Sequence, residues 1–246
     1  ASEVYKRQPL ARPDRSASLD LLKWLAIVTM VGDHLRYLWP DQHWLFVVGR
    51  LAFPFFCLAI AANVARSVPG VLFSPGNGRY LGWCLAFSLA SELPYRWLDN
   101  GSVTLNVMPT LTLGLVVAWG VHHRGRAAVG LALAALLAAA LGSQWLMYGL
   151  PGVLLPAAFL LSLQRPGYGW LAGLLAMAGN LTNGWILHNA LQPIAVVVLA
   201  TAFVAAPLGL VLLPARVPWA VRPVGRWGYG FYPLHLAAIK LVSVIS

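Results

Sequence analysis

Asp33 and His34 are neighbours in the second half of an apolar stretch that runs from Leu19 to Trp39. The stretch is long and apolar enough to cross a bilayer as one helix. Ionisable side chains inside a membrane helix are costly, and those that are kept there usually serve a function. The alternative interpretation is a pair at the membrane interface, with both side chains reaching for water. We take Asp33 and His34 as the first candidates for chemistry.

A histidine that titrates near neutral pH can act as a general base or as a nucleophile. Asp33 points about 100° away from His34 on an ideal helix, so we expect it to pair with Arg50 in the next apolar stretch. Arg50 can equally hold an oxyanion or an anionic substrate. The sequence has no glycine-rich phosphate loop, HExxH motif or GxSxG motif. It therefore disfavours an ATPase, a zinc protease and a serine hydrolase.

The 246-residue chain is 59% hydrophobic and 10% charged, whereas a soluble domain carries about 25% charged residues. We therefore expect an all-α, polytopic membrane protein. Cys57 and Cys84 lie in separate apolar runs and predict neither a disulfide framework nor a metal site. The net charge of +10 comes largely from basic residues in alternate connections. This pattern indicates membrane topology rather than a nucleic-acid partner.

Nine apolar stretches predict transmembrane helices, at residues 19–39, 44–66, 79–98, 103–121, 127–142, 146–163, 169–187, 190–213 and 226–245. Pro54 predicts a kink in the second helix. The fifth stretch is short and the seventh is weakly apolar, so either can be re-entrant instead. We expect a single transmembrane domain over residues 19–246. A basic cytoplasmic tail over residues 1–18 precedes it and can touch anionic lipid.

The charges of the connections set the expected orientation. Basic residues gather in the even-numbered connections: Arg66, Arg79, Arg124, Arg126, Arg165, Arg216, Arg222 and Arg226. The odd-numbered connections carry Arg36 and Arg96, which Asp41 and Asp99 partly offset. Basic residues favour the cytoplasmic side. We therefore place the N-terminus in the cytoplasm and, with nine helices, the C-terminus outside.

Depth along the predicted helices brings polar residues of different helices to one level. His34 lies about 7 Å and Arg50 about 9 Å from the outer helix ends. The same outer region is expected to hold Glu92, Asn106, Tyr148, Asn180 and Asn183, whereas His235 lies near the middle of the last helix. Polar groups at one level can pair and hydrate in a shared cavity. We expect such a cavity in the outer part of the membrane.

Five blocks of the sequence carry a family resemblance. They are LDLLKWLAIVTMVGDHLRYL at 19–38, GRLAFPFFCLAIAANVAR at 49–66, LNVMPTLTLG at 105–114, YGLPGVLL at 148–155 and FYPLHL at 231–236. The first looks like an opening helix with Met-x-x-Asp-His, and the second is similar to a Gly-Arg-x-x-Phe-Pro block. Together they resemble the TraX family of conjugative pilin acetylases, which includes the TrbP-type proteins. No block is specific by itself, but their order and spacing agree over nearly all of residues 19–240.

The resemblance implies a membrane-embedded N-acetyltransferase of the bacterial inner membrane, related to wider transmembrane acyltransferases. Its expected reaction moves an acetyl group from acetyl-CoA to the N-terminal amine of a conjugative pilin subunit during pilus biogenesis. The residues that match by position are Asp33, His34, Arg50, Asn106 and His235. We expect His34 to be the base and Asn106 to donate to the oxyanion. Asp33 and Arg50 set the electrostatics, while His235 either steadies the donor or is itself the base.

Arginines at the cytoplasmic mouth are candidates for binding the phosphates of acetyl-CoA, because arginine suits bidentate phosphate contacts. These are Arg124, Arg126, Arg216, Arg222 and Arg226. The positive-inside rule accounts for the same residues without a ligand. We weigh direct transfer above a covalent acetyl-histidine, because an amine is already a competent nucleophile. A small transporter and a non-catalytic pilus assembly factor stay open as alternatives, as does the oligomeric state.

Overall fold

Residues 16–245 are described by the computed structural model, and their regular secondary structure is entirely helical. The helices are α1 (Ala17–Leu35), α2 (His43–Gly49), α3 (Ala52–Ala65), α4 (Pro75–Leu98), α5 (Val107–His123), α6 (Arg126–Leu141), α7 (Gly149–Gln164), α8 (Gly169–Asn180), α9 (Gly184–His188), α10 (Pro193–Leu212) and α11 (Trp227–Ile245). Short 3-10 turns, η1 (Ser143–Trp145) and η2 (Pro166–Tyr168), precede α7 and α8. The all-α prediction is confirmed for this part of the chain. All but the last three residues of the predicted basic tail lie outside it.

Three helical segments among the described residues are long and apolar enough to cross a membrane. They are His43–Ala65, which joins α2 and α3, Pro193–Leu212 and Trp227–Ile245. Shorter apolar helices accompany them, among them α5, α6 and α7. These segments indicate a membrane protein, while the count of nine spans and the cytoplasmic N-terminus stay predictions.

Two of the predicted helices are broken in the structure. The stretch at 44–66 divides at Arg50 and Leu51 into α2 and α3. Pro54 explains the position of this break, because proline has no N–H to bond the carbonyl four residues earlier and its ring crowds that carbonyl. The predicted kink is therefore centred one turn before Pro54. The stretch at 169–187 divides into α8 and α9, and the Asn183 side chain caps α9 by accepting from the backbone N–H of Ile186.

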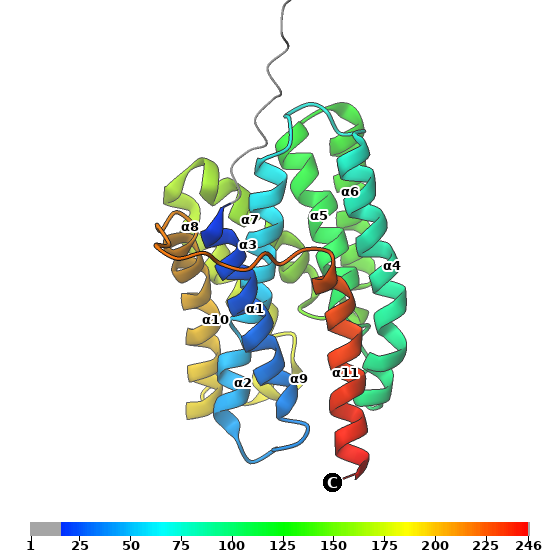
Figure 1. Ribbon diagram of the computed structural model, residues 1–246, viewed down its shortest axis with the longest axis vertical. Helices are drawn as coiled ribbons and strands as arrows, with labels where there is room; N and C mark the ends of the chain where they lie inside the picture. Colours follow the sequence, from blue (N-terminus) through cyan, green and yellow to red (C-terminus); the bar gives the residue numbers. More distant parts are fainter. Residues whose placement is uncertain (1–15, 246) are drawn as a thin grey trace, which may run out of the picture.

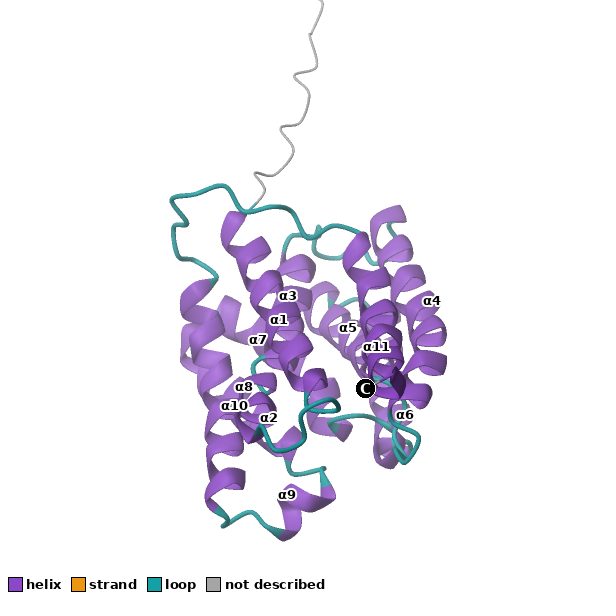
Figure 2. Cartoon of the chain, turned by 60° about the horizontal axis from the view of Figure 1, so that its bottom comes forward, coloured by secondary structure: helices purple, strands orange, loops and turns teal. Residues whose placement is uncertain are grey.

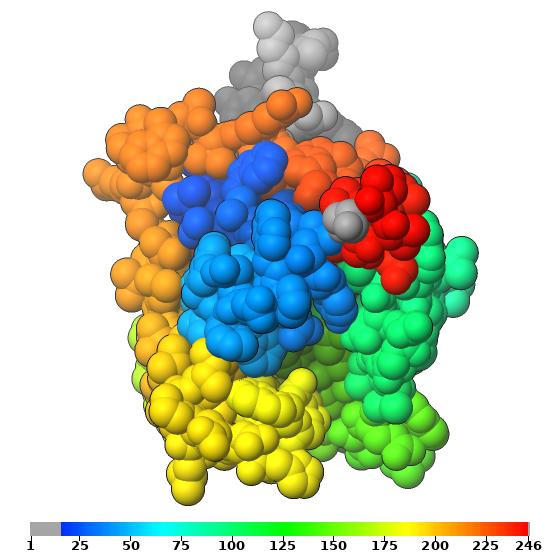
Figure 3. Space-filling model, turned by 90° about the horizontal axis from the view of Figure 1, so that it is seen from below, coloured from blue at the N-terminus to red at the C-terminus, as the bar shows by residue number. Residues whose placement is uncertain are grey.

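The long helices run between two ends of the molecule, where the connections gather (Figures 1 and 2). Connections 66–74, 124–125, 165–168 and 213–226 share one end, which we call the basic end after its arginines. Connections 36–42, 99–106, 142–148 and 181–192 share the other, which we call the site end. Figure 3 looks onto the site end, where the α1–α2 region lies between segment 181–192 and the end of α11. The charge alternation of the sequence thus separates the connections into two groups in space.

The core is built around α3, most of whose side chains are buried. Phe55 and Leu58 of α3 and Phe159 of α7 are among the largest fully buried side chains. Small residues allow close helix contacts elsewhere, as is common between membrane helices. At Gly114 of α5 an added Cβ would lie 2.7 Å from the Pro156 ring of α7. This packing fixes α5 against α7 and so holds the connections that form the site end.

Candidate functional site

A polar cavity of about 350 Å³ opens at the site end. Its lining comes from six regions of the chain and includes Asp33, His34, Tyr37, Arg50, Asp99, Thr104, Tyr148, Asn180 and Asn183. Depth along the helices predicted a shared cavity for several of these residues, and the structure brings them together. Asn106 and Glu92, which the same reasoning placed there, are not part of this lining.

Arg50 is the most heavily bonded charged group of the cavity, and only 7% of the residue is exposed. Its Nη2 donates to Oδ1 of Asp33 at 2.7 Å, and its Nη1 donates to Oδ1 of Asn180 at 3.2 Å. Nη1 also lies 3.5 Å from the Tyr148 hydroxyl, and Nε donates to the Phe46 carbonyl at 3.1 Å. The expected pairing of Asp33 with Arg50 is confirmed. A buried charge of this kind is tolerated because its partners surround it.

Close approach of α1 and α2 makes the Asp33–Arg50 pair possible. Gly49 precedes Arg50 and faces Asp33, and an added Cβ would lie 2.4 Å from the Asp33 Cβ. No other residue type therefore fits at Gly49 without moving one of the two helices. The break after α2 then puts Arg50 at the helix end, beside the cavity.

His34 and His235 form a direct pair, with Nδ1 of His34 2.7 Å from Nε2 of His235. The other ring nitrogen of His235, Nδ1, lies 3.0 Å from the Phe231 carbonyl. A carbonyl only accepts, so Nδ1 of His235 carries a hydrogen and, in the neutral ring, Nε2 is a bare acceptor. It follows that Nδ1 of His34 donates to His235. The basic nitrogen of His34 is then Nε2, on a residue that lines the polar cavity.

His235 is closer to His34 than its position in the last helix indicated. His34 is next to the last residue of α1, whereas α11 continues from His235 to Ile245. The two helices therefore do not end at the same level, and the middle of α11 lies beside the end of α1. The expectation that His235 lies deeper than His34 is corrected by this contact. Tyr232, which sequence reasoning missed, lies on the same side of α11, with its ring centroid 5.7 Å from that of His235 and 6.3 Å from that of His34.

Asn106 lies in a separate network and is fully buried. Its Nδ2 donates to the Ser88 carbonyl at 2.8 Å and to Oε2 of Glu92 at 2.7 Å. Its Oδ1 accepts from the backbone N–H of Met108, which makes Asn106 the N-cap of α5. Both amide hydrogens are thus already donated, and the geometry gives Asn106 a positioning role instead of the expected contact with an oxyanion. Asparagine is a preferred N-cap residue, which is the signal that identifies this role in the sequence.

The five arginines predicted to bind phosphate differ in their surroundings. Arg226 lines a second cavity, which is largely apolar and is described below. Arg124 and Arg126 flank the turn between α5 and α6, and the backbone of Arg124 adopts φ 55° there. Arg216 and Arg222 lie in connection 213–226, where the Arg222 carbonyl accepts from Nε1 of Trp24. Among the cavities described here, Arg226 is the member of this set that contributes to a lining.

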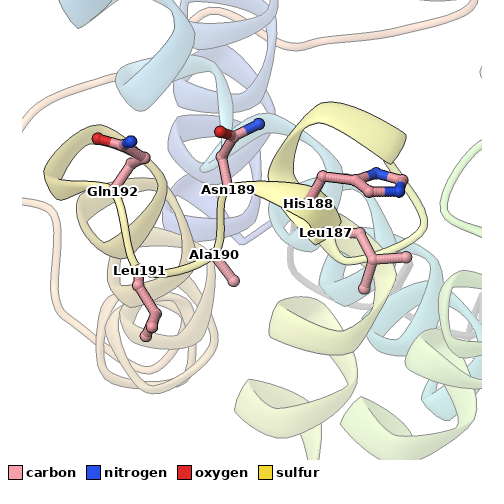
Figure 4. A pocket seen from close by; sticks show the side chains of 6 residues that line it. All are labelled: Leu187, His188, Asn189, Ala190, Leu191 and Gln192. Atoms are coloured by element: carbon pink, nitrogen blue, oxygen red, sulfur yellow. The ribbon is translucent and has the colours of Figure 1, made fainter.

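A surface hollow of about 480 Å³ lies at the α9–α10 connection (Figure 4). In this view the side chains of His188, Asn189 and Gln192 point to one side of the chain, and those of Leu187, Ala190 and Leu191 point to the other. All six are exposed or half-buried. We assign no chemistry to this hollow, because a turn with polar side chains on one side and apolar side chains on the other also suits the interface between membrane and water.

Comparisons with known proteins identify the family. The family model described as TraX protein matches residues 18–243. A Protein TraX from Escherichia coli is 30% identical over 142 residues, which are 56% of this chain and 53% of that protein. A second Protein TraX, from Escherichia coli strain K12, is 48% identical over 48 residues, which are 19% of each chain. The chain thus spans about half the length of the first relative, and no solved structure matches it. Because the family model covers nearly the whole sequence, this chain belongs to the TraX family.

Proposed function

We propose that this chain is an acetyltransferase of the bacterial inner membrane that acts in conjugation. It moves an acetyl group from acetyl-CoA to the N-terminal amine of a pilin subunit. The observation that carries the proposal is the chain of contacts from His34 through His235 to the Phe231 carbonyl, at the edge of a polar cavity. These contacts present a ring nitrogen of His34 as a base, and His235 fixes the orientation of that base.

The chemistry assigned to His34 is proton removal from the attacking amine. An α-amine has an unperturbed pKa of about 7.7–8.0, so part of it is neutral near pH 7. The amine nitrogen forms a bond to the acetyl carbon, and one of its protons passes to Nε2 of His34. The C–S bond then breaks and coenzyme A leaves as a thiolate, which takes up the proton from His34. General base catalysis of this kind contributes about 10²–10⁴-fold to the rate.

Tyr148 replaces Asn106 as the candidate donor to the oxyanion. The Tyr148 hydroxyl lies 3.5 Å from Nη1 of Arg50, and Tyr148 lines the polar cavity. Because the arginine approaches the phenol oxygen as a donor, the phenol hydrogen is directed elsewhere and is free for a third group. Arg50 and Asp33 then serve as the fixed charges of the site, held in place before a substrate arrives.

The test is intact-mass analysis of the pilin subunit from cells with and without this chain. We expect an acetylated N-terminus that depends on the chain and is lost with His34→Ala. His188→Ala is the matched control, because His188 is an exposed histidine of α9 outside the polar cavity. Equal acetylation by His34→Ala and the wild type, at equal protein level, would overturn the assignment of the base. A pilin whose mass does not change in any strain would overturn the function.

A further inference from the structure

A second cavity, of about 370 Å³, extends inward from the basic end. Its lining comes from α1, α3, α4, α5, α11 and connection 213–226, and most of it is apolar: Ile27, Met30, Phe56, Ala59, Ile60, Met108, Leu111 and Val224. Two basic residues, Lys23 and Arg226, belong to the same lining. Arg226 is exposed, and Lys23 lies 3.7 Å from Oδ1 of Asp20. The cavity therefore combines an apolar interior with positive charge where it opens.

The inner end of this cavity lies near the histidine pair, with Met30 and Tyr232 in its lining and neither histidine part of it. Met30 lies one turn before His34 on the same face of α1, a separation of about 6 Å along the helix. On α11 the lining residues Gly228, Tyr229 and Tyr232 lead in the same way to His235. The ring centroid of Tyr232 lies 5.7 Å from that of His235 and 6.3 Å from that of His34. The apolar cavity and the polar cavity thus approach His34 and His235 from opposite ends of the molecule.

The dimensions of the apolar cavity suit a ligand with a long flexible chain and a charged group at one end. From Lys23 to His34 the separation along α1 is about 16 Å, a distance that an extended pantetheine arm spans. Pockets of a few hundred Å³ with apolar walls and few polar groups are typical of small-molecule sites. Arginine and lysine are the usual partners of phosphate groups. A phospholipid shares this chemistry, since it also joins an apolar chain to a phosphate.

We propose that the apolar cavity binds the pantetheine arm of an acyl-CoA thioester, with Lys23 and Arg226 next to its phosphates. The thioester then reaches the histidine pair from the basic end, while the amine arrives through the polar cavity. This inference rests on the proposed function and adds the route and the binding site of the donor. It also selects Arg226 among the five arginines that the sequence offered for phosphate binding.

Two free cysteines of the chain supply a test with its own control. Cys84 lines the apolar cavity, whereas Cys57 is buried but is not part of that lining. We would treat the purified protein with N-ethylmaleimide and follow both cysteines by peptide mass spectrometry. Acetyl-CoA at about ten times its dissociation constant is expected to slow alkylation of Cys84 about tenfold by mass action and to leave Cys57 unchanged. Adenosine 3′,5′-bisphosphate, which has the head group without the arm, is expected not to protect Cys84.

Binding variants decide the outcome if Cys84 itself proves unreactive. Ala59→Leu narrows the cavity, and Arg226→Gln removes a charge at its opening; both are expected to weaken acetyl-CoA binding in calorimetric titration. Arg79→Gln, an exposed arginine outside the lining, is the matched control. Unchanged binding by Ala59→Leu, or equal protection of Cys84 by lysophosphatidic acid and acetyl-CoA, overturns the proposal. Because these readouts measure binding, a protein that binds acetyl-CoA here but fails to acetylate pilin would refute only the proposed function.

Discussion

Replacing His235 by phenylalanine isolates the role of the histidine pair. Phenylalanine keeps a ring next to Phe231, which stacks on His235 with ring centroids 5.1 Å apart. It removes the acceptor that lies 2.7 Å from Nδ1 of His34. Nothing then fixes the hydrogen of His34 on Nδ1, so Nε2 is no longer held as the free base. His235 acts in this scheme as a positioning residue, because it works through His34.

The size of the effect follows from the lost hydrogen bond. Leaving a partly buried donor without its hydrogen-bond partner costs about 1–3 kcal/mol of free energy. At about 1.36 kcal/mol for each factor of ten, the rate constant kcat should fall about 5- to 150-fold. KM for acetyl-CoA and for the acceptor should change little, because the substitution removes neither a binding charge nor a wall of the apolar cavity.

His235→Gln provides the matching rescue. Its side-chain oxygen can accept the same hydrogen from His34, so it should recover most of the activity that His235→Phe loses. The assay is the initial rate of acetyl transfer to a peptide with the pilin N-terminus, in membranes of equal protein content, with thermal unfolding as a check of folding. A normal rate for His235→Phe refutes the positioning role. Equal loss by both variants shows that His235 is itself the base.

Three further predictions concern the fixed charges and the topology. Asp33→Ala leaves Arg50 as an unpaired buried charge and should destabilise the protein by about 3–5 kcal/mol. The double variant Asp33→Ala/Arg50→Met should recover part of this stability, as measured by thermal unfolding in detergent. No recovery would contradict the pairing. Gly49→Ala forces a Cβ into the Asp33 side chain and should cost about 1–3 kcal/mol and most of the acetylation. Gly32→Ala is its control, since an added Cβ there has nothing within 4 Å, and equal melting temperatures for the two variants would refute the steric argument. A reporter fused after Ser246 should be active outside the cytoplasm if nine helices span the membrane, and a cytoplasmic signal would contradict that count.

Local pattern was sufficient for much of this architecture. The apolar stretches predicted the positions of the helices because burial in a bilayer demands long apolar runs. The Asp33–Arg50 pair was also predictable, since two opposite charges in neighbouring apolar helices have few other ways to be neutralised. The break at Arg50 was predicted only approximately. The break lies at Arg50 because the carbonyl four residues before Pro54 receives no N–H from the proline.

The contact of His34 with His235 could not be predicted in the same way. Depth was counted from helix ends, and this assumes that all helices end at one level. In the structure α11 continues well beyond the level at which α1 ends. The role of Asn106 was missed for a different reason. An asparagine that caps a helix and one that donates to an oxyanion can be distinguished only when the hydrogen bonds of the side chain are known. The contact of His34 with His235 joins residues that lie far apart in the sequence, whereas the partners of Asn106 lie within 18 residues of it.

The connection between α10 and α11 is attached to α1 through its backbone. The carbonyls of Leu213 and Arg222 accept from the side chains of Ser18 and Trp24, and the N–H of Val224 donates to Asp20. The side chains that make these contacts all belong to α1, whereas the connection contributes only main-chain atoms. Substitutions over residues 213–223 should therefore be tolerated wherever the path of the connection is kept, and substitutions of the α1 residues should not. Among relatives, sequence drift is expected to accumulate over 213–223 while the first two turns of α1 stay constant.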